Sequence, residues 1–313
     1  MADKPDVLQS VSPEKVLREI AEAIPANCRK NVVVIGSLAA GYHFFRGQDT
    51  MLVRTKDADC LLSPRVAAIS AGVAVTECLF KNQWTFRADE KWGKPGTAKT
   101  PTNDLPAVRL QPPGSSKWFI ELLAVPAAPQ DRGISHTRIQ TRYGHFSLVS
   151  FGFLALVNYE PLPTDMGIHI ARPEMMALAN LLSHPEIGPA TMGGMIAGRQ
   201  IKRSNKDLGR VLAIARLAIG RDQDALQDWP RLWETALRTR YPKEWVSLAS
   251  DAGRGLRQLL ASHADLDEAQ HTCQWGLLAS NPPSSNQLRI AGKRLLQDTI
   301  EPLEATAQTQ EPS

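Results

Sequence analysis

The sequence predicts an α+β fold in which a mixed sheet flanked by helices is followed by a helical domain. In the first half, short runs rich in Val and Ile alternate with helix-like segments, which is typical of a sheet covered by helices. In the second half, Leu, Ala, Ile and Met recur at helical spacing. A length of 313 residues allows two domains. We expect them at residues 1–165 and 166–305, with a disordered polar tail at 306–313.

The first elements follow from local signals. Ser12-Pro13-Glu14 provides an N-cap, a proline in the first turn and an early acid, so an amphipathic helix should begin there. The apolar run from Asn31 to Ile35 ends at Gly36-Ser37, as a buried strand followed by a sharp turn does. The next expected elements are a helix at Leu38–Phe45, a strand at Ala58–Leu62 and a helix at Arg65–Phe80.

The rest of the first half indicates an antiparallel addition to the sheet. The polar stretch from Asp89 to Pro106 predicts a surface loop. Val108–Gln111 and Trp118–Val125 are strand-like runs joined by Pro-Pro-Gly-Ser-Ser, which predicts a hairpin. His145–Val157 is strand-like or mixed, and Pro161-Leu162-Pro163 breaks the pattern before the expected domain boundary.

The second half reads as a set of helices because its apolar residues recur every three or four positions. The expected helices are Pro173–Ser183, Ser204–Ile219, Asp228–Arg240, Ser247–Ser262 and Ser285–Ile300.

Composition favours a soluble cytoplasmic protein without membrane contact. The hydrophobic share is 43% and the charged share 22%, both ordinary for a globular protein. The longest apolar runs are far too short to span a bilayer, and no secretory leader is recognisable. The four cysteines form no CxxC pair, so we expect buried thiols rather than a disulfide framework or a zinc cluster.

Basic charge is concentrated in one segment of the second half. Between Arg199 and Glu244 there are eleven Lys and Arg against six Asp and Glu. Arg199, Arg203, Lys206 and Arg210 follow helical spacing, so they form either a solvated basic face or a surface for a phosphate-bearing partner.

Three acids carry the functional argument. Asp57 and Asp59 lie two residues apart on a predicted strand, so both side chains point to the same face of the sheet. Glu121 lies within the apolar run Phe119-Ile120-Glu121-Leu122-Leu123, where a charge needs a partner or a ligand. If the two strands are neighbours, the three carboxylates converge where two Mg²⁺ ions can bridge a triphosphate and an attacking hydroxyl.

The turn at Gly36-Ser37 supplies the complementary chemistry. Backbone amides at such a turn, with a helix N-terminus behind them, can hold phosphate oxygens, and the Ser37 hydroxyl adds a donor.

Each feature also has a structural interpretation. Asp57 and Asp59 together are compatible with a solvated strand edge, and Gly36-Ser37 with an ordinary turn. Glu121 is compatible with an ion pair to Arg109 across the predicted hairpin. The order and spacing of all three features together favour the functional interpretation.

Together these motifs resemble the DNA polymerase beta-type nucleotidyltransferase superfamily. The resemblance rests on Val-Val-Val-Ile-Gly-Ser, on the run from Arg54 to Leu62 that contains Asp57 and Asp59, and on Ile-Glu-Leu-Leu around Glu121. It covers about residues 30–125. The chain looks closest to the abortive-infection (AbiEii) toxin branch because of the Arg-Thr-Lys-Asp-x-Asp run and the later segment from Lys202 to Leu208.

The resemblance implies an enzyme that transfers a nucleotidyl group from a nucleoside triphosphate to an acceptor hydroxyl. It implies two Mg²⁺ ions held by the three acids. The implied acceptor is RNA, with the tRNA 3′ end as the example, and an antitoxin protein is an implied partner. The expected nucleotide contacts are Gly36, Ser37, Arg54, Lys56, Lys202, Lys206 and Asp207, in which Lys202 or Lys206 neutralises the triphosphate and Asp207 orients the lysine.

The chain departs from the family pattern at three points, and two other functions fit the residues. The gap from Gly36 to Asp57 is long, Asn180 stands where a lysine is expected, and the third acid is Glu rather than Asp. A nucleotidyltransferase acting on a small molecule, as antibiotic-modifying enzymes do, is one alternative. A catalytically inactive nucleotidyltransferase fold that serves as a binding module is the other.

Overall fold

The first predicted strand is present as β2 (Val32–Val34), a run of three buried valines in the computed structural model of the chain. Branched side chains of this kind favour a strand that is packed on both faces. The structure describes residues 9–86, 93–114, 118–187 and 191–310.

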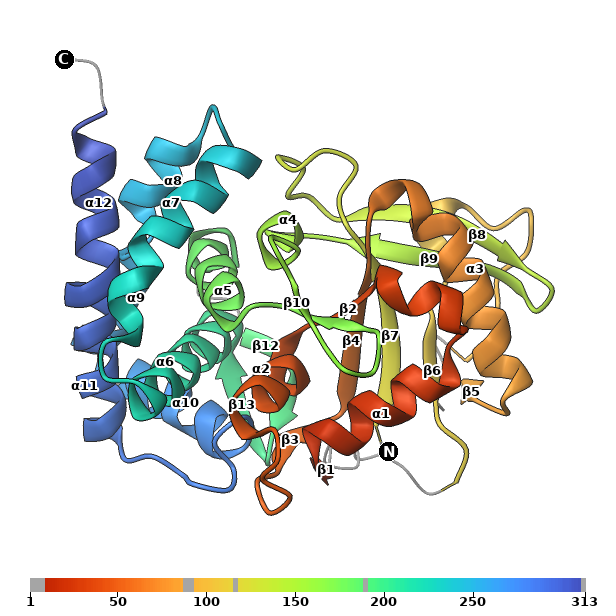
Figure 1. Cartoon of the computed structure of the whole chain (residues 1–313), viewed down its shortest axis with the longest axis horizontal. Helices are drawn as coiled ribbons and strands as arrows, with labels where there is room; N and C mark the ends of the chain where they lie inside the picture. Colours follow the sequence, from red (N-terminus) through yellow and green to blue (C-terminus); the bar gives the residue numbers. More distant parts are fainter. Residues whose placement is uncertain (1–8, 87–92, 115–117, 188–190, 311–313) are drawn as a thin grey trace. The chain divides into compact units, whose positions relative to one another are not determined.

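The described chain divides into two compact units (Figure 1). The sheet unit comprises residues 11–42 and 55–172. The helical unit comprises the described parts of residues 1–10, 43–54 and 173–313. The predicted fold class is confirmed, since a mixed multi-stranded sheet with helices is accompanied by a helical region in the C-terminal half.

The sheet unit is built on one nine-stranded sheet. Seven of its strands follow the order β10-β11-β2-β4-β7-β6-β5, and β9 joins β7 and carries β8. The strands after β2 are β4 (Asp57–Leu62), β5 (Thr85–Phe86), β6 (Arg109–Gln111), β7 (Phe119–Ala124), β8 (Ser135–Thr141), β9 (Gly144–Ser150), β10 (Leu162–Pro163) and β11 (His169–Ile170). A separate two-stranded sheet pairs β1 (Gln9–Val11) with β3 (Val53–Thr55).

Strand directions in the sheet are mixed. β4 runs parallel to β7 and antiparallel to β2, while β6 runs antiparallel to β7. The hairpin predicted from two apolar runs is therefore present as β6 and β7, although Ser115 and Ser116 of its connection lie outside the described residues. The predicted loop at Asp89–Pro106 is irregular from residue 93 onward apart from one short turn of helix, and its first four residues also lie outside them.

One face of the sheet is covered by α3 (Arg65–Lys81), which packs against β4, β7 and β8 (Figure 1). A Cβ atom placed on Gly72 of α3 would lie 3.3 Å from Leu62 and 3.0 Å from Leu148, so the helix lies close to the strands there. Because side chains alternate along a strand, Ala58, Cys60 and Leu62 face α3. Asp57 and Asp59 therefore project from the opposite face.

The helix predicted after Ser12 is present, whereas the helix expected at Leu38–Phe45 begins two residues earlier, at Gly36. α1 (Pro13–Ala23) begins after Ser12, whose hydroxyl accepts a hydrogen bond from the Lys15 amide at 3.5 Å. Its buried face includes Val16 and Ile20. The other helical segments are η1 (Ala26–Asn31), α2 (Gly36–Phe45), η2 (Thr102–Asp104) and α4 (Leu154–Val157).

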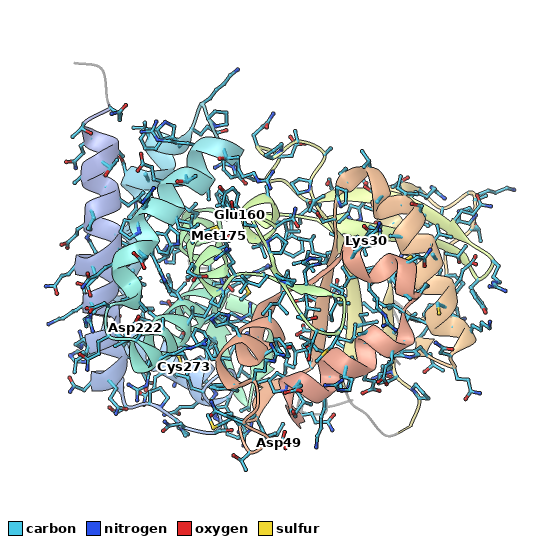
Figure 2. The ribbon with its side chains drawn as sticks, viewed as in Figure 1. Lys30, Asp49, Glu160, Met175, Asp222 and Cys273 are labelled. Atoms are coloured by element: carbon cyan, nitrogen blue, oxygen red, sulfur yellow. The ribbon has the colours of Figure 1, made fainter. Side chains whose placement is uncertain are left out.

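The helical unit is organised around α6 (Arg203–Arg221), which packs against α5, α10 and α11. Met175 on α5 and Cys273 on α10 are both buried among these helices (Figure 2). The other elements are α5 (Pro173–Ile187), β12 (Thr191–Ile196), β13 (Arg199–Lys202), η3 (Ala225–Asp228), α7 (Trp229–Arg240), α8 (Trp245–Asp251), α9 (Arg254–Ala261), α10 (His263–Gln274), α11 (Ser285–Leu295), the π-helical turn η4 (Leu296–Ile300) and α12 (Glu301–Gln308).

One helix prediction and one disorder prediction for this unit were wrong in extent. The single helix expected at Ser247–Ser262 is divided into α8 and α9 around Gly253. A Cβ atom at Gly253 would lie 2.7 Å from Glu304 Oε1 and 2.8 Å from Ile300, so close packing against the C-terminal helix coincides with the break. The disorder predicted for residues 306–313 was wrong for 306–308. These residues belong to α12, which buries Leu303 and Ala307. Residues 311–313 lie outside the described residues.

Several elements were not predicted or were predicted otherwise. For the second half the sequence predicted five helices and nothing else, so the β12–β13 hairpin and α10 were not foreseen. β8 was not foreseen because its sequence is mostly polar. The Pro161–Pro163 segment was expected only to end the strand-like pattern, yet Leu162 and Pro163 form β10, which pairs with β11. β10 is the first strand of the sheet order, and an edge strand tolerates proline because one side needs no amide donor.

The thiols behave largely as predicted. Cys28, Cys60 and Cys273 are buried free cysteines, while Cys78 is half-buried. Burial raises the pKa of Cys273 to about 12, so its thiol stays protonated. Among the described residues, no helix combines the length and the apolar character that crossing a bilayer requires.

Candidate active site

Asp57 and Asp59 lie on the first half of β4, on the face opposite α3, and both are partly exposed. The Thr55 side chain, which is 7% exposed, holds Asp57 in place. The Thr55 hydroxyl donates to Asp57 Oδ1 at 3.0 Å and lies 3.0 Å from the Asp57 carbonyl oxygen. The carboxylate is therefore held by a side chain two residues before it, a contact that the sequence analysis did not foresee.

Glu121 is the immediate neighbour of Asp59 across the β4–β7 ladder. The two residues are directly paired in the parallel register, as are Asp57 and Phe119. Paired residues of neighbouring strands project from the same face of a sheet. Asp57, Asp59 and Glu121 thus share one face of the sheet.

The Glu121 carboxylate also has a cationic partner. Arg109 on β6 is paired with Glu121 in the antiparallel register, and its guanidinium donates to Glu121 Oε1 at 2.9 Å. The side chains of Arg109 and Glu121 are 26% and 13% exposed. The cross-strand ion pair considered from the sequence is therefore formed.

Within the part of the chain that the structure describes, no three His, Cys, Asp or Glu side chains are grouped closely enough to hold a metal ion.

The Gly36 turn lies on the other side of Asp59. The Ile35 amide donates to the Asp59 carbonyl at 2.9 Å, and a Cβ atom on Gly36 would lie 3.5 Å from Asp59 Oδ2. Gly36 has a φ of +75°, a conformation that favours glycine. It also begins α2, so the first amides of this helix lie beside the carboxylate.

Asp59 contributes to the pKa of Cys60, the residue that follows it. Burial raises the pKa of the Cys60 thiol well above its usual range, and the negative charge of Asp59 raises it further. Cys60 therefore remains a neutral thiol, packed toward α3.

The two basic residues before Asp57 belong to different units. Arg54, in the helical unit, stacks its guanidinium over the Trp275 ring at 4.3 Å and donates to Ser10 Oγ at 3.3 Å. Lys56, in the sheet unit, is half-buried, and its carbonyl accepts from the Phe119 amide at 3.0 Å. Arg54 is thus held by an aromatic ring that the sequence analysis did not connect with it.

Lys202 is neutralised inside the helical unit. Its Nζ lies 2.7 Å from Asp265 Oδ1, and its amide donates to Glu268 Oε2 at 3.0 Å. Asn205 donates to both acids at 2.8 Å. The hydrogen bond from Lys202 lowers the pKa of Asp265 to about 2, and the same contact raises the pKa of Lys202.

The residues that follow Lys202 lie on the first turns of α6. Asp207 is buried and forms an ion pair with Arg210 at 3.5 Å, while Lys206 is half-buried. The prediction that Arg199 continues this helical face was wrong. Arg199 lies on strand β13, before the helix begins, and pairs with Asp267 at 2.6 Å.

Several residues of these sites were missed by the sequence analysis. Thr55 lies two positions before the predicted metal ligand Asp57, so its contact with that carboxylate could have been inferred from the sequence. Asp265 and Glu268 lie more than sixty positions after Lys202, and no local pattern connects them.

The expected nucleotide contacts are thus distributed over both units. Gly36, Ser37, Lys56 and the three acids belong to the sheet unit, whereas Arg54, Lys202, Lys206 and Asp207 belong to the helical unit. No protein-family model, curated protein or solved structure matches the chain.

Proposed function

We propose that the chain is a nucleotidyltransferase of the DNA polymerase beta type that uses Mg²⁺ and a nucleoside triphosphate. One observation carries the proposal: Asp59 has the Gly36 turn on one side and Glu121 on the other. A turn suited to phosphate oxygens and carboxylates suited to a hard cation are therefore neighbours on one sheet.

The acids fit Mg²⁺ in part. Asp57 and Asp59 are partly exposed on the same face and offer the oxygen ligands that Mg²⁺ prefers. Glu121 would join them after releasing Arg109, whose ion pair now occupies its carboxylate. Two bound Mg²⁺ ions would offset the negative charge of the triphosphate.

The chain's own groups would position the reactants. The first amides of α2 and the Ser37 hydroxyl would hold phosphate oxygens, and Thr55 would keep the Asp57 carboxylate oriented. The acceptor hydroxyl oxygen would then bond to the α-phosphorus while the bond to pyrophosphate breaks. The hydroxyl proton would pass to a carboxylate of the acid row, Asp57, Asp59 and Glu121, or to water.

RNA is the acceptor class that we propose, with the tRNA 3′ end as the first case to test. The basic segment from Arg199 to Glu244 would bind the RNA backbone. The resemblance to the AbiEii branch adds the proposal that an antitoxin protein controls the activity.

The test is nucleotide transfer by the purified protein with Mg²⁺, each labelled triphosphate and total RNA. Asp57→Ala and Asp59→Ala should each abolish label transfer while leaving the fold intact, because removal of one carboxylate relieves repulsion in the metal-free protein. Asp104→Ala, which changes an exposed acid of the same unit, is the control and should transfer label like the parent. Transfer by Asp57→Ala at the parental rate would rule out this mechanism.

A second function, a catalytically inactive module that binds nucleotide, is favoured by the Arg109–Glu121 ion pair. In such a module Glu121 would serve as the structural partner of Arg109 across the hairpin and not as a metal ligand. Arg109→Gln separates the two functions. Under the enzyme proposal, the released Glu121 should tighten Mg²⁺ binding several-fold in calorimetric titrations.

Under the binding-module proposal, the same variant should leave Mg²⁺ binding unchanged. It should only lower the free energy of unfolding, by about 1–3 kcal/mol for the loss of a partly buried charged hydrogen bond. Arg142→Gln is the matched control, because Arg142 pairs with Glu77 at 3.4 Å and is 61% exposed. It should change neither Mg²⁺ affinity nor, by more than about 0.5 kcal/mol, stability.

A further inference from the structure

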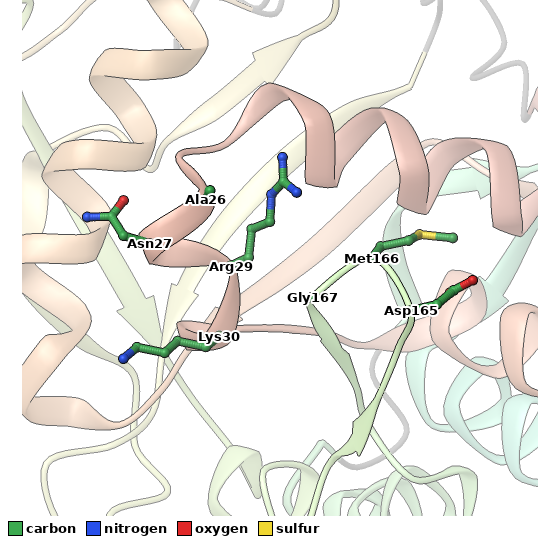
Figure 3. Close-up of a pocket in the computed structure, with 7 residues that line it drawn as sticks. All are labelled: Ala26, Asn27, Arg29, Lys30, Asp165, Met166 and Gly167. Atoms are coloured by element: carbon green, nitrogen blue, oxygen red, sulfur yellow. The ribbon is translucent and has the colours of Figure 1, made fainter.

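A pocket of about 450 Å³ lies in the sheet unit between η1 and the turn that joins β10 to β11 (Figure 3). Its lining residues are Ala26, Asn27, Arg29, Lys30, Asp165, Met166 and Gly167. Pockets of about 300–1,000 Å³ are typical of small-molecule sites. The lining contains two cations and one acid, so its charge balance favours an anionic group.

Among the described lining residues, Arg29 carries a buried side-chain donor that lacks a partner. Its Nε atom is buried without a hydrogen bond, and no described acidic side chain forms an ion pair with its guanidinium. An unsatisfied donor on a permanent cation is costly, because the donor has lost water and gained nothing in return. A bound oxyanion would balance the charge of this side chain, since a guanidinium binds the two oxygens of such a group as a fork.

The acid in the lining does not neutralise Arg29. Asp165 Oδ1 accepts a hydrogen bond from the Tyr42 hydroxyl at 2.9 Å. In Figure 3 the Asp165 side chain points away from Arg29, toward the helix that carries Tyr42. The positive charge of Arg29 is therefore left for a ligand.

The wall opposite Arg29 is preformed. The Thr164 hydroxyl donates to the Ile168 carbonyl at 2.7 Å, and the Thr164 amide donates to the same carbonyl at 3.0 Å. Gly167, with a φ of +79°, brings the turn against Arg29, because a Cβ atom there would lie 3.7 Å from Arg29 Cδ. The side chain is thus fixed along its stem while its Nε lacks an acceptor.

The pocket is separate from the acid row. Arg29 and Lys30 precede β2, whereas Gly36 follows it, so the two sites lie at opposite ends of this strand. The Asn31 carbonyl accepts from the Ser63 amide at 2.9 Å, which places η1 beside the end of β4 that is remote from Asp57.

We propose that this pocket binds the oxyanion of a small molecule, a phosphate or a carboxylate, through the Arg29 guanidinium. Asn27 and Lys30 leave η1 on the other side from Arg29 in Figure 3 and border the pocket, where Lys30 adds long-range attraction. The site does not depend on nucleotidyl transfer.

The test is calorimetric titration of the whole chain with sodium phosphate and, separately, with sodium acetate, at constant ionic strength and with a chelator present. The parent should bind at least one of the two anions. Arg29→Gln should bind it at least about tenfold more weakly, the scale of a lost charged hydrogen bond. Arg29→Lys keeps the positive charge but loses the two-pronged guanidinium, so its anion affinity should lie between those of the parent and Arg29→Gln.

Arg18→Gln is the matched control, since it removes one positive charge from a 52% exposed side chain of the same unit. It should bind like the parent. Preference for phosphate or for acetate identifies the oxyanion, and binding that persists in Ser37→Ala separates this site from the phosphate site proposed at the Gly36 turn. Near-ultraviolet circular dichroism checks that the Arg29 variants fold. The proposal is overturned if the parent binds neither anion, or if Arg29→Gln and Arg29→Lys both bind like the parent.

Discussion

Lys202 illustrates how one residue can serve stability where the sequence indicated ligand binding. Its ammonium group contacts Asp265, which also accepts a hydrogen bond from Asn205 and is 25% exposed. The depressed pKa of Asp265, about 2, means that the folded state favours the charged carboxylate. The pair should therefore contribute stability above about pH 4, and that contribution should disappear as the pH falls through about 2.

Lys202→Gln tests this contribution. At pH 7 the variant should lose about 1 kcal/mol of unfolding free energy, a value reduced for solvent screening. The difference from the parent should shrink between about pH 4 and pH 2, where Asp265 becomes protonated in both proteins. Urea unfolding at several pH values measures it.

Arg199→Gln is the control for that series, because its partner Asp267 is 57% exposed and the pair should contribute little. An equal loss for Lys202→Gln at pH 7 and at pH 2 would contradict the assignment. Unchanged stability at pH 7 would leave Lys202 available for the triphosphate contact expected from the sequence.

Residue roles were predictable from the sequence only where the partners are near each other in the chain or share a strand. The two-residue spacing of Asp57 and Asp59 determined their common face, and the hairpin made Arg109 a foreseeable partner of Glu121. The contacts of Arg54 with Trp275 and of Lys202 with Asp265 join residues that are remote in sequence. Periodicity carries no information about such pairs.

At the level of elements, α6 and α10 are held together by a glycine contact. A Cβ atom on Gly209 of α6 would lie 2.8 Å from the Ala269 carbonyl oxygen, which belongs to the backbone of α10. The Cys273 thiol also donates to the Gly209 carbonyl at 3.1 Å. The two helices approach so closely here that no side chain fits between them.

Gly209→Ala should therefore destabilise the protein by about 1–3 kcal/mol, because the colliding atom is backbone and cannot rotate away. Gly220→Ala is a control in the same helix, since a Cβ atom there meets nothing within 4 Å. It should stabilise the protein by about 0.5–1 kcal/mol, as alanine favours the helix. Denaturant unfolding of both variants measures the difference, and equal effects would disprove the close contact.

Helices with long, uninterrupted apolar patterns are the elements that the sequence predicted well. α3 and α6 were foreseen because such patterns continue through them. The separation of α8 from α9 escaped prediction because it depends on packing of Gly253 against the last helix rather than on local propensity. β12 and β13 escaped because a two-stranded hairpin of short strands has little periodic signal.

At the level of the whole molecule, the basic segment is the surface on which RNA binding can be tested. Several of its arginines already have acidic partners, since Arg199 pairs with Asp267 and Arg210 with Asp207. Arg203 is exposed at the start of α6, and no ion pair to it is formed among the described residues. Arg203 is therefore the first residue at which RNA contact should be measurable.

If α6 binds the RNA backbone, each phosphate that it neutralises releases counterions, so RNA affinity should fall steeply with salt while triphosphate affinity falls less. Changing both Arg203 and Arg210 to glutamate should weaken RNA binding and reduce the slope of log affinity against log salt by about 0.7 for each lost contact with a single strand. Lys293→Glu, an exposed charge reversal on α11, should leave the slope unchanged. Because a glutamate in place of Arg210 would repel Asp207, Arg210→Gln must show the same direction of change with a smaller loss of stability. If the double variant binds RNA with the parental slope at every salt concentration, the acceptor does not lie on this helix, and a small-molecule acceptor becomes the better proposal.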